Sequence, residues 1–189
     1  MIDRKIVLAS QSPRRKELIG VIAEKVEIRP APCDETLPDG IGAREAVEYL
    51  SKIKNEAARK ISADEEIVIS ADTVVAVNDE ILGKPTDKED ARRMLNLLSG
   101  KTHQVYTGVT IADDKGSVTF SEKTDVVFYE LTEQEIEEYI SSSEPYDKAG
   151  AYGIQGKAGL LVKGIIGDYY NVVGLPIARL KRELKKFIK

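Results

Sequence analysis

The chain has 189 residues, of which 42% are apolar and 32% are charged, as is usual for a soluble globular protein. Its formal net charge of −4 argues against a general nucleic-acid binder, which is usually basic, so any basic site must be local. The single cysteine, Cys33, excludes an intrachain disulfide and argues against a cysteine-based zinc site.

The first half of the chain alternates predicted strands and helices. Apolar runs predict strands at 5–9, 26–28 and 66–78, the last being one long strand or two joined by a break. Helices are predicted at 13–22 and about 42–62, separated by a proline- and acid-rich loop at 30–40. The inward stripe of the second helix is predicted to comprise Val47, Leu50, Ala57, Ala58 and Ile61.

The second half contains a predicted hairpin flanked by helices. Thr86 with Glu89, and Thr132 with Glu135, match the capping box that opens a helix. The predicted helices are 87–98, 132–142 and one starting at Pro176, and the predicted strands are a short one after 78–80, then 103–112, 117–129, 159–165 and 169–173. A hairpin within an alternating pattern favours an α/β fold with a mixed sheet, and the chain length fits one domain or two small lobes.

The stretch 8–18 places basic residues at a predicted helix start, where acidic residues are usual. Ser12 suits the N-cap and Pro13 the first helical position. The positive end of a helix favours acids, yet Arg14, Arg15 and Lys16 follow here. With an anion bound, these cations, the free N–H groups and the serines would form a phosphate site. The alternative is that they are solvated surface charges.

Two charged residues interrupt apolar patterns. Asp72 breaks a valine-rich strand run, and burying a carboxylate is costly unless it is paired or metal-bound. We therefore expect Asp72 at a strand end facing a ligand cleft, with Thr73 beside it, the alternative being a turn aspartate that caps backbone N–H groups. Lys54 shares the inward face of its helix and either extends to solvent or points into a cleft.

Other candidates are weaker when taken alone. Glu35 lies in an acidic loop and matters only if a divalent metal is needed. Lys84 sits between Gly83 and Pro85, where an exposed turn lysine is equally compatible. Gln155 lies among glycines at 150–159, a segment that permits close ligand approach or forms a plain connection. The only histidine, His103, receives no role.

Seven motifs in order resemble the Maf family of nucleoside triphosphate pyrophosphatases over nearly the whole chain. The segment AYGIQG is similar to that of its dTTP/UTP pyrophosphatase branch. The motifs are LASQSPRRKEL (8–18), CDE (33–35), SADT (70–73), LGKP (82–85), LSGKTHQV (98–105), DKAGAYGIQG (147–156) and GLP (174–176). No departure from the family is seen at a functional position.

The resemblance implies a fold, a site and an activity. The implied fold is α/β, a mixed twisted sheet with flanking helices in one Maf-like domain over 1–189, with two lobes around a deep cleft, similar to inosine triphosphate pyrophosphatases. Asp72 corresponds to the proton acceptor, and Arg14, Thr73 and Gln155 to substrate-specificity positions. The other cleft-lining positions are Ser10, Arg15, Glu35, Lys54 and Lys84. A divalent cation, Mg²⁺ or Mn²⁺, and a homodimer are also implied.

The expected reaction is hydrolysis of dTTP, UTP or modified uridine triphosphates to a monophosphate and pyrophosphate. Asp72 would activate a water, and Glu35 with Asp72 would hold the metal. The alternatives are a non-catalytic nucleotide-binding regulator linked to septum formation, and a phosphomonoesterase. The sequence shows no signal peptide or membrane span, so we expect a cytoplasmic enzyme that binds neither membrane nor nucleic acid.

Overall fold

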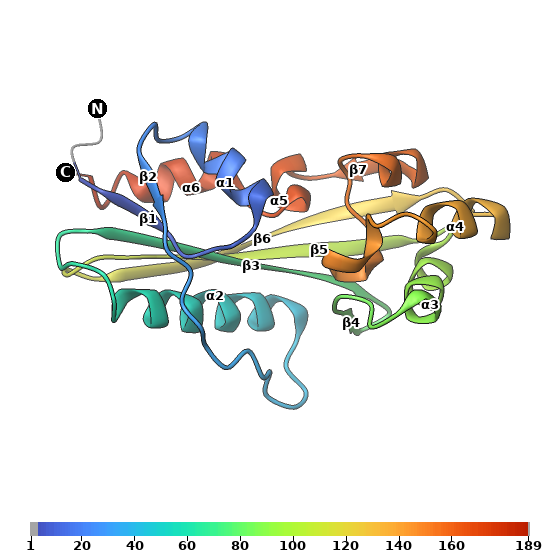
Figure 1. Ribbon diagram of the computed structural model, residues 1–189, viewed down its shortest axis with the longest axis horizontal. Coiled ribbons are helices and arrows are strands. Elements are labelled where there is room, and N and C mark those ends of the chain that lie inside the picture. Colours follow the sequence, from blue (N-terminus) through green and yellow to red (C-terminus); the bar gives the residue numbers. More distant parts are fainter. Residues whose placement is uncertain (1–3, 189) are drawn as a thin grey trace.

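The computed structural model describes residues 4–188, so residues 1–3 and 189 of the predicted domain lie outside the described part. A seven-stranded sheet forms its centre, with α-helices around it (Figure 1). The strands are β1 (Ile6–Leu8), β2 (Val26–Ile28), β3 (Ile67–Val77), β4 (Glu80–Leu82), β5 (Thr102–Ala112), β6 (Ser117–Phe128) and β7 (Val162–Ile166). The α-helices are α1 (Pro13–Gly20), α2 (Ala43–Arg59), α3 (Lys88–Leu98), α4 (Glu133–Ile140), α5 (Tyr169–Val173) and α6 (Ile177–Leu184).

The sheet is mixed, as the sequence predicts. Its order is β2-β1-β3-β5-β6-β7, with β4 paired to β3 beside this path. Strand β1 runs parallel to both β2 and β3, while the other pairs are antiparallel. Parallel neighbours need a crossover connection, which α1 and α2 provide, whereas the long β5–β6 hairpin needs only the turn at 113–116.

Helices cover both faces of the sheet. Helix α2 lies on one face, and α1, α5 and α6 lie on the other (Figure 1). Helices α3 and α4 gather at one end of the long strands (Figure 1). No helix within residues 4–188 is long and apolar enough to cross a membrane.

The apolar core has two large clusters along the same strands. One cluster includes Val75 and Val105 and packs with α3 and α4. The other includes Ile69 and Val109 and packs with α1 and α6. Strands β3 and β5 therefore contribute to both clusters, with one cluster at each end of these strands. The division of the domain into two lobes stays a prediction.

Several helix starts match their sequence signals. Ser12 caps α1, its hydroxyl accepting a hydrogen bond from Arg15 N, and Pro13 follows at the first helical position. Thr132 and Glu135 form the predicted capping box of α4. The Thr86–Glu89 box is wrong, because Asp87 caps α3 by accepting from Asp90 N at 2.8 Å. An aspartate caps as well as a threonine does, so the start lies one residue later.

The segment 169–173 was predicted as a strand and is the helix α5. Its aromatic and β-branched residues favour a strand by propensity alone. However, the Asp168 carboxylate accepts from Tyr170 N at 2.8 Å and caps a helix, and Gly174 ends it at a φ of 123°. The strand predicted at 159–165 begins instead as a 3₁₀ turn at Lys157–Leu161, and only then becomes β7. Local capping chemistry outweighs propensity here.

Two further predictions need correction. In the stripe of α2, Val47, Leu50 and Ala58 are buried, but Ile61 is 58% exposed because the helix has already ended at Arg59. Asp72 was expected at a strand end, yet it lies in the middle of β3, which runs without a break from Ile67 to Val77.

Candidate active site

The candidate site lies where one edge of β3 has no partner strand. One edge pairs with β5 from Val68 to Ala76. The other edge pairs with β1 at 67–69 and with β4 at 75–77, which leaves the middle of the strand free. A central pocket of about 620 Å³ is lined by Asp72, Thr73 and Val74 of this free stretch. This volume lies within the usual range for small-molecule sites.

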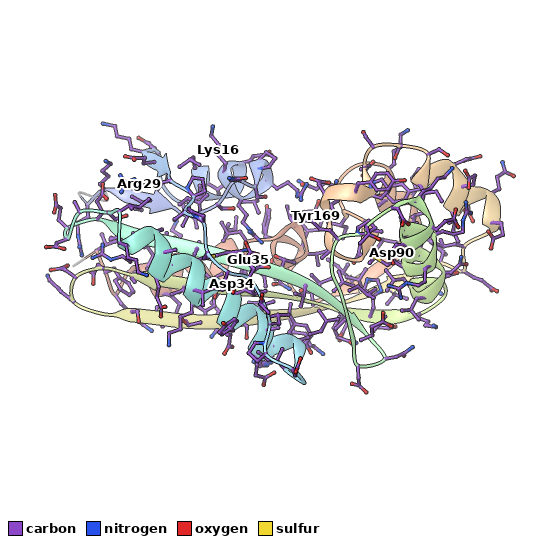
Figure 2. The ribbon with its side chains drawn as sticks, turned by 60° about the horizontal axis from the view of Figure 1, so that its bottom comes forward. Lys16, Arg29, Asp34, Glu35, Asp90 and Tyr169 are labelled. Atoms are coloured by element: carbon purple, nitrogen blue, oxygen red, sulfur yellow. The ribbon has the colours of Figure 1, made fainter. Side chains whose placement is uncertain are left out.

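The free edge lets the pocket reach both faces of the sheet. Successive residues of a strand point to opposite faces. Asp72 accordingly contacts Lys54 of α2, and Thr73 contacts Arg15 of α1. Glu35 belongs to the loop before α2, which runs on the same side of the sheet as that helix (Figures 1 and 2). All of these side chains line the one pocket.

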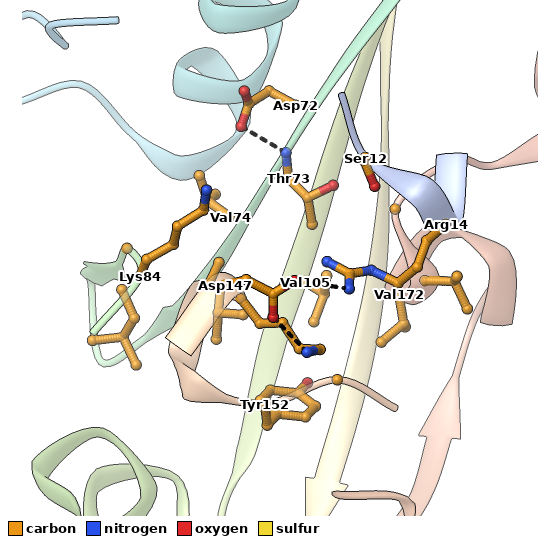
Figure 3. Close-up of a pocket in the computed structure, with 18 of the residues that line it drawn as sticks. Ser12, Arg14, Asp72, Thr73, Val74, Lys84, Val105, Asp147, Tyr152 and Val172 are labelled. Carbon is orange, nitrogen blue, oxygen red and sulfur yellow. Dashed lines mark hydrogen bonds and ion pairs between the residues drawn. The ribbon is translucent and has the colours of Figure 1, made fainter. Parts of the chain in front are cut away.

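Lys54 lies between two carboxylates. Its ammonium group donates to the Asp72 carboxylate and lies 2.8 Å from Glu35 Oε2. Burial lowers the pKa of Lys54, but the charge of Asp72 and hydrogen bonds to both carboxylates outweigh burial and raise it. The other oxygen of Asp72 accepts from Thr73 N at 2.8 Å (Figure 3). The Asp72 carboxylate is therefore fixed from two directions.

Arg15 is held from both ends of its guanidinium. Nε donates to Gly174 O at 2.9 Å, and a terminal nitrogen donates to Thr73 Oγ1 at 3.0 Å. Burial lowers the pKa of Arg15, while the negative charges of Asp72 and Glu35 oppose that decrease. A guanidinium stays charged in proteins, so Arg15 is a pre-positioned cation in the pocket wall.

A second arginine faces an acid across the pocket. A terminal nitrogen of Arg14 lies 3.3 Å from Asp147 Oδ2 (Figure 3). The other carboxylate oxygen of Asp147 lies 2.5 Å from Lys148 Nζ. Burial raises the pKa of Asp147, but the hydrogen bond and charge of Lys148 outweigh it and the pKa is lowered. This ion pair links the start of α1 to the segment 145–147, so the two sides of the pocket are in contact.

Two exposed side chains complete the polar lining. Lys84 follows β4, where Gly83 O accepts from Gly150 N at 2.9 Å and so joins this turn to the glycine-rich segment. Gln155 lies on that same segment and is exposed at the pocket. These residues come from distant parts of the sequence and meet only in the folded chain.

Comparison with known proteins identifies the family. Residues 5–187 match the model of the Maf-like protein family. The chain belongs to this family.

Relatives of this Maf-like protein carry a specific name. It is 52% identical to a Bacillus cereus protein named dTTP/UTP pyrophosphatase, over 97% of this chain and 96% of the relative. A Bacillus anthracis protein of the same name matches with the same identity and coverage. Among solved structures, the Staphylococcus aureus Ham1 protein superposes with a TM-score of 0.59 at 18% identity, covering 97% of this chain and 99% of that one. That likeness shows a shared fold.

The pocket of this Maf-like protein gathers every predicted site residue except Ser10. The residues that line it are Arg14, Arg15, Glu35, Lys54, Asp72, Thr73, Lys84 and Gln155. Ser10 is 7% exposed, and its hydroxyl accepts from Ser12 N at 3.2 Å. Ser10 thus shapes the loop before α1, whereas Ser12 lines the pocket. The roles assigned to these residues stay predictions.

Asp147 and Lys148 line the pocket and were not predicted. They open the glycine-rich segment, where an acid–base pair suggests a surface turn rather than a site. The available signal was their position next to the segment that carries Gln155. No sequence pattern indicates that this segment faces the start of α1.

The carboxylates of the pocket suit a divalent cation in part. Within residues 4–188, no group of three or more His, Cys, Asp or Glu side chains is placed to hold a metal. Mg²⁺, however, is commonly held by one or two carboxylates together with substrate phosphates. Glu35 and Asp72 share the ammonium of Lys54, so their oxygens already converge on one cation. This donor set fits such a site.

Proposed function

We propose that this Maf-like protein hydrolyses dTTP and UTP to the nucleoside monophosphate and pyrophosphate. The observation that carries the proposal is the fixed carboxylate of Asp72 within a pocket rich in arginine and lysine. The names of relatives at 52% identity over nearly the whole chain support the same substrates. Modified uridine triphosphates share the chemistry of these substrates and belong to the same proposal.

The charge of the pocket suits a triphosphate together with a divalent ion. Five cationic side chains and three carboxylates line it, which leaves an excess of two positive charges. A nucleoside triphosphate carries roughly four negative charges at neutral pH. The side chains alone therefore neutralise about half of the ligand, and a divalent cation supplies the remainder. The cations are Arg14, Arg15, Lys54, Lys84 and Lys148, and the acids are Glu35, Asp72 and Asp147.

Glu35 and Asp72 are the residues that would hold Mg²⁺ or Mn²⁺. When bound, such an ion lowers the pKa of a coordinated water and offsets phosphate charge. Lys54 holds the two carboxylates together without the ion, so the ligands are arranged in advance. Arg14 and Arg15 belong to α1 on the other face of β3 and hydrogen-bond to neither of these carboxylates, so their remaining N–H groups can bind phosphate oxygens.

Asp72 is the proposed proton acceptor. Its two oxygens offer about four lone pairs, of which Lys54 and Thr73 N use two. The remaining lone pairs can accept a proton from a water positioned in line with the α-phosphorus. The cations that hold the triphosphate would also stabilise the departing pyrophosphate. Gln155, Arg14 and Thr73 are the proposed contacts that select the base.

The test is pyrophosphate release from dTTP and UTP with Mg²⁺ or Mn²⁺. Asp72→Asn keeps the shape of the side chain, and we expect a rate loss of about 10² or more because the general base is removed. Asp87→Asn is the matched control, since asparagine caps a helix as well as aspartate and Asp87 lies at α3. Normal turnover by Asp72→Asn would refute its role. Binding of dTTP without release by the unaltered protein would favour the regulator, and orthophosphate release a phosphomonoesterase.

A further inference from the structure

A chain of hydrogen bonds runs from Arg15 into the buried sheet. Thr73 Oγ1 accepts from Arg15 at 3.0 Å and lies 2.9 Å from Thr107 Oγ1. Thr107 Oγ1 donates in turn to Asn171 O at 2.9 Å. Thr107 is fully buried on β5, directly opposite Thr73 in the register, and it does not line the pocket. It therefore acts on the pocket only through its neighbours.

The direction of each hydroxyl proton in this chain follows from chemistry. A carbonyl oxygen can only accept, so the single proton of Thr107 is committed to Asn171 O. Thr107 Oγ1 can then only accept from Thr73, which uses the single proton of Thr73. Thr73 Oγ1 is left with lone pairs alone, one of which takes the hydrogen bond from Arg15. Toward the pocket Thr73 is an acceptor and not a donor.

Asn171 anchors the far end of the chain. Its side-chain amide donates to Val105 O and to Thr124 Oγ1, both at 3.0 Å, and the residue is fully buried. The backbone carbonyl of Asn171 also accepts from Gly174 N at 3.1 Å, and the backbone carbonyl of Gly174 is the second partner of Arg15. Both partners of the Arg15 guanidinium are thus connected to Asn171 O, Thr73 through Thr107 and Gly174 through its own N–H.

We propose that Thr107 is a positioning residue that fixes Thr73 as a hydrogen-bond acceptor and holds Arg15 in the pocket wall. The nucleotide group that contacts Thr73 must then carry a donor, such as a ring N–H or a sugar hydroxyl. This inference rests on the proposed function for its substrate. The side-chain partner of Asp72, Lys54, lies on the other face of β3, so Thr107 governs binding and not the proton transfer.

The test compares two buried threonines of β5. Thr107→Val keeps the shape and removes the hydroxyl, whereas Thr107→Ser restores it. Thr110→Val is the matched control, because Thr110 is 3% exposed and its hydroxyl also has two hydrogen-bond partners, here the hydroxyls of Ser51 and Thr119. Those partners do not line the pocket. If a valine variant fails to fold, the alanine variants of both threonines replace the valine pair.

Thr107→Val should raise the KM for UTP about tenfold, the effect of weakening one hydrogen bond to a charged group, with kcat within about threefold of the unaltered protein. Thr107→Ser and Thr110→Val should each leave KM within about twofold. A KM unchanged in Thr107→Val, or raised equally in Thr110→Val, would overturn the proposal.

A second readout needs no substrate. The Nε proton of Arg15, identified in an NMR spectrum by its loss in Arg15→Lys, should exchange with solvent about tenfold faster in Thr107→Val than in Thr110→Val. Equal exchange rates in the two variants would contradict the positioning role. If the unaltered protein releases no pyrophosphate, the proposed function fails, while this exchange measurement still decides the role of Thr107.

Discussion

Gly108 lies directly against the backbone of α2. It pairs with Asp72 across β5 and β3. A Cβ placed on it would lie 2.2 Å from Val47 O, 2.4 Å from Val47 C and 2.8 Å from Glu48 N. These are backbone atoms of α2, so no side chain can rotate away. In Gly108→Ala, α2 must therefore move by about 1 Å to restore ordinary contact distances.

The displacement should affect both stability and turnover. Overpacking of this kind costs about 1–3 kcal/mol, which exceeds the gain of about 0.5–1 kcal/mol from replacing a strand glycine. At about 2–4 °C per kcal/mol for a chain of this size, we expect Tm to fall by several degrees. Lys54 moves with α2 and away from Asp72, and a misplacement of about 1 Å can cost about 10² in rate.

The assay is thermal unfolding together with pyrophosphate release from dTTP. Gly164→Ala is the matched control, because Gly164 lies in β7 with no atom within 4 Å of an added Cβ. We expect that control to keep its Tm and turnover. If Gly108→Ala also keeps both, the close approach of α2 does not position Lys54 and the reasoning fails.

Two other perturbations test the electrostatics. His103 is fully buried beside the Tyr152 hydroxyl at 2.7 Å, and burial lowers its pKa to about 4. Its side chain stays neutral in the folded state, whereas in the unfolded chain it binds a proton below its ordinary pKa, so stability is lost as pH falls from about 6.5 toward 4. His103→Gln should remove about 2 kcal/mol of the stability loss between pH 7 and 5, measured as Tm against pH. An identical pH dependence in the variant would contradict this. Asp147→Asn removes a negative charge beside Arg14, so the KM for dTTP should fall about threefold at low salt and less at high salt. A rise in KM would show instead that Asp147 assists binding.

Local signals predicted much of the fold and part of the site. Ser12 and Pro13 mark the start of α1, and the Thr132–Glu135 box marks α4, because caps depend on neighbouring residues only. Asp72 and Lys54 were detectable since each places a charge in an apolar pattern. The family resemblance then grouped residues that no single pattern could connect.

Non-local geometry accounts for what the sequence could not predict. Asp72 lies mid-strand because β5 pairs along β3 on both sides of it, and it lies at a free edge because β1 and β4 pair only with the ends of β3. Asp147 meets Arg14 across a sequence separation of 133 residues, with no pattern linking them. The close approach at Gly108 depends on how α2 lies on the sheet. Such features arise from packing between elements rather than from propensity within one.

The two core clusters share uninterrupted strands, and this constrains how the protein can move. Strands β3 and β5 pass from one cluster to the other within regular pairing, so no loop between them can serve as a hinge. Rotating one end of the molecule against the other would have to twist a hydrogen-bonded sheet. Closure around a ligand is therefore expected to move the segments that border the pocket, above all those joined by the Arg14–Asp147 ion pair. The part of the pocket wall formed by β3 is expected to stay stiff. In such a scaffold, opening or closing of the pocket changes the Arg14–Asp147 distance rather than the pairing of the sheet.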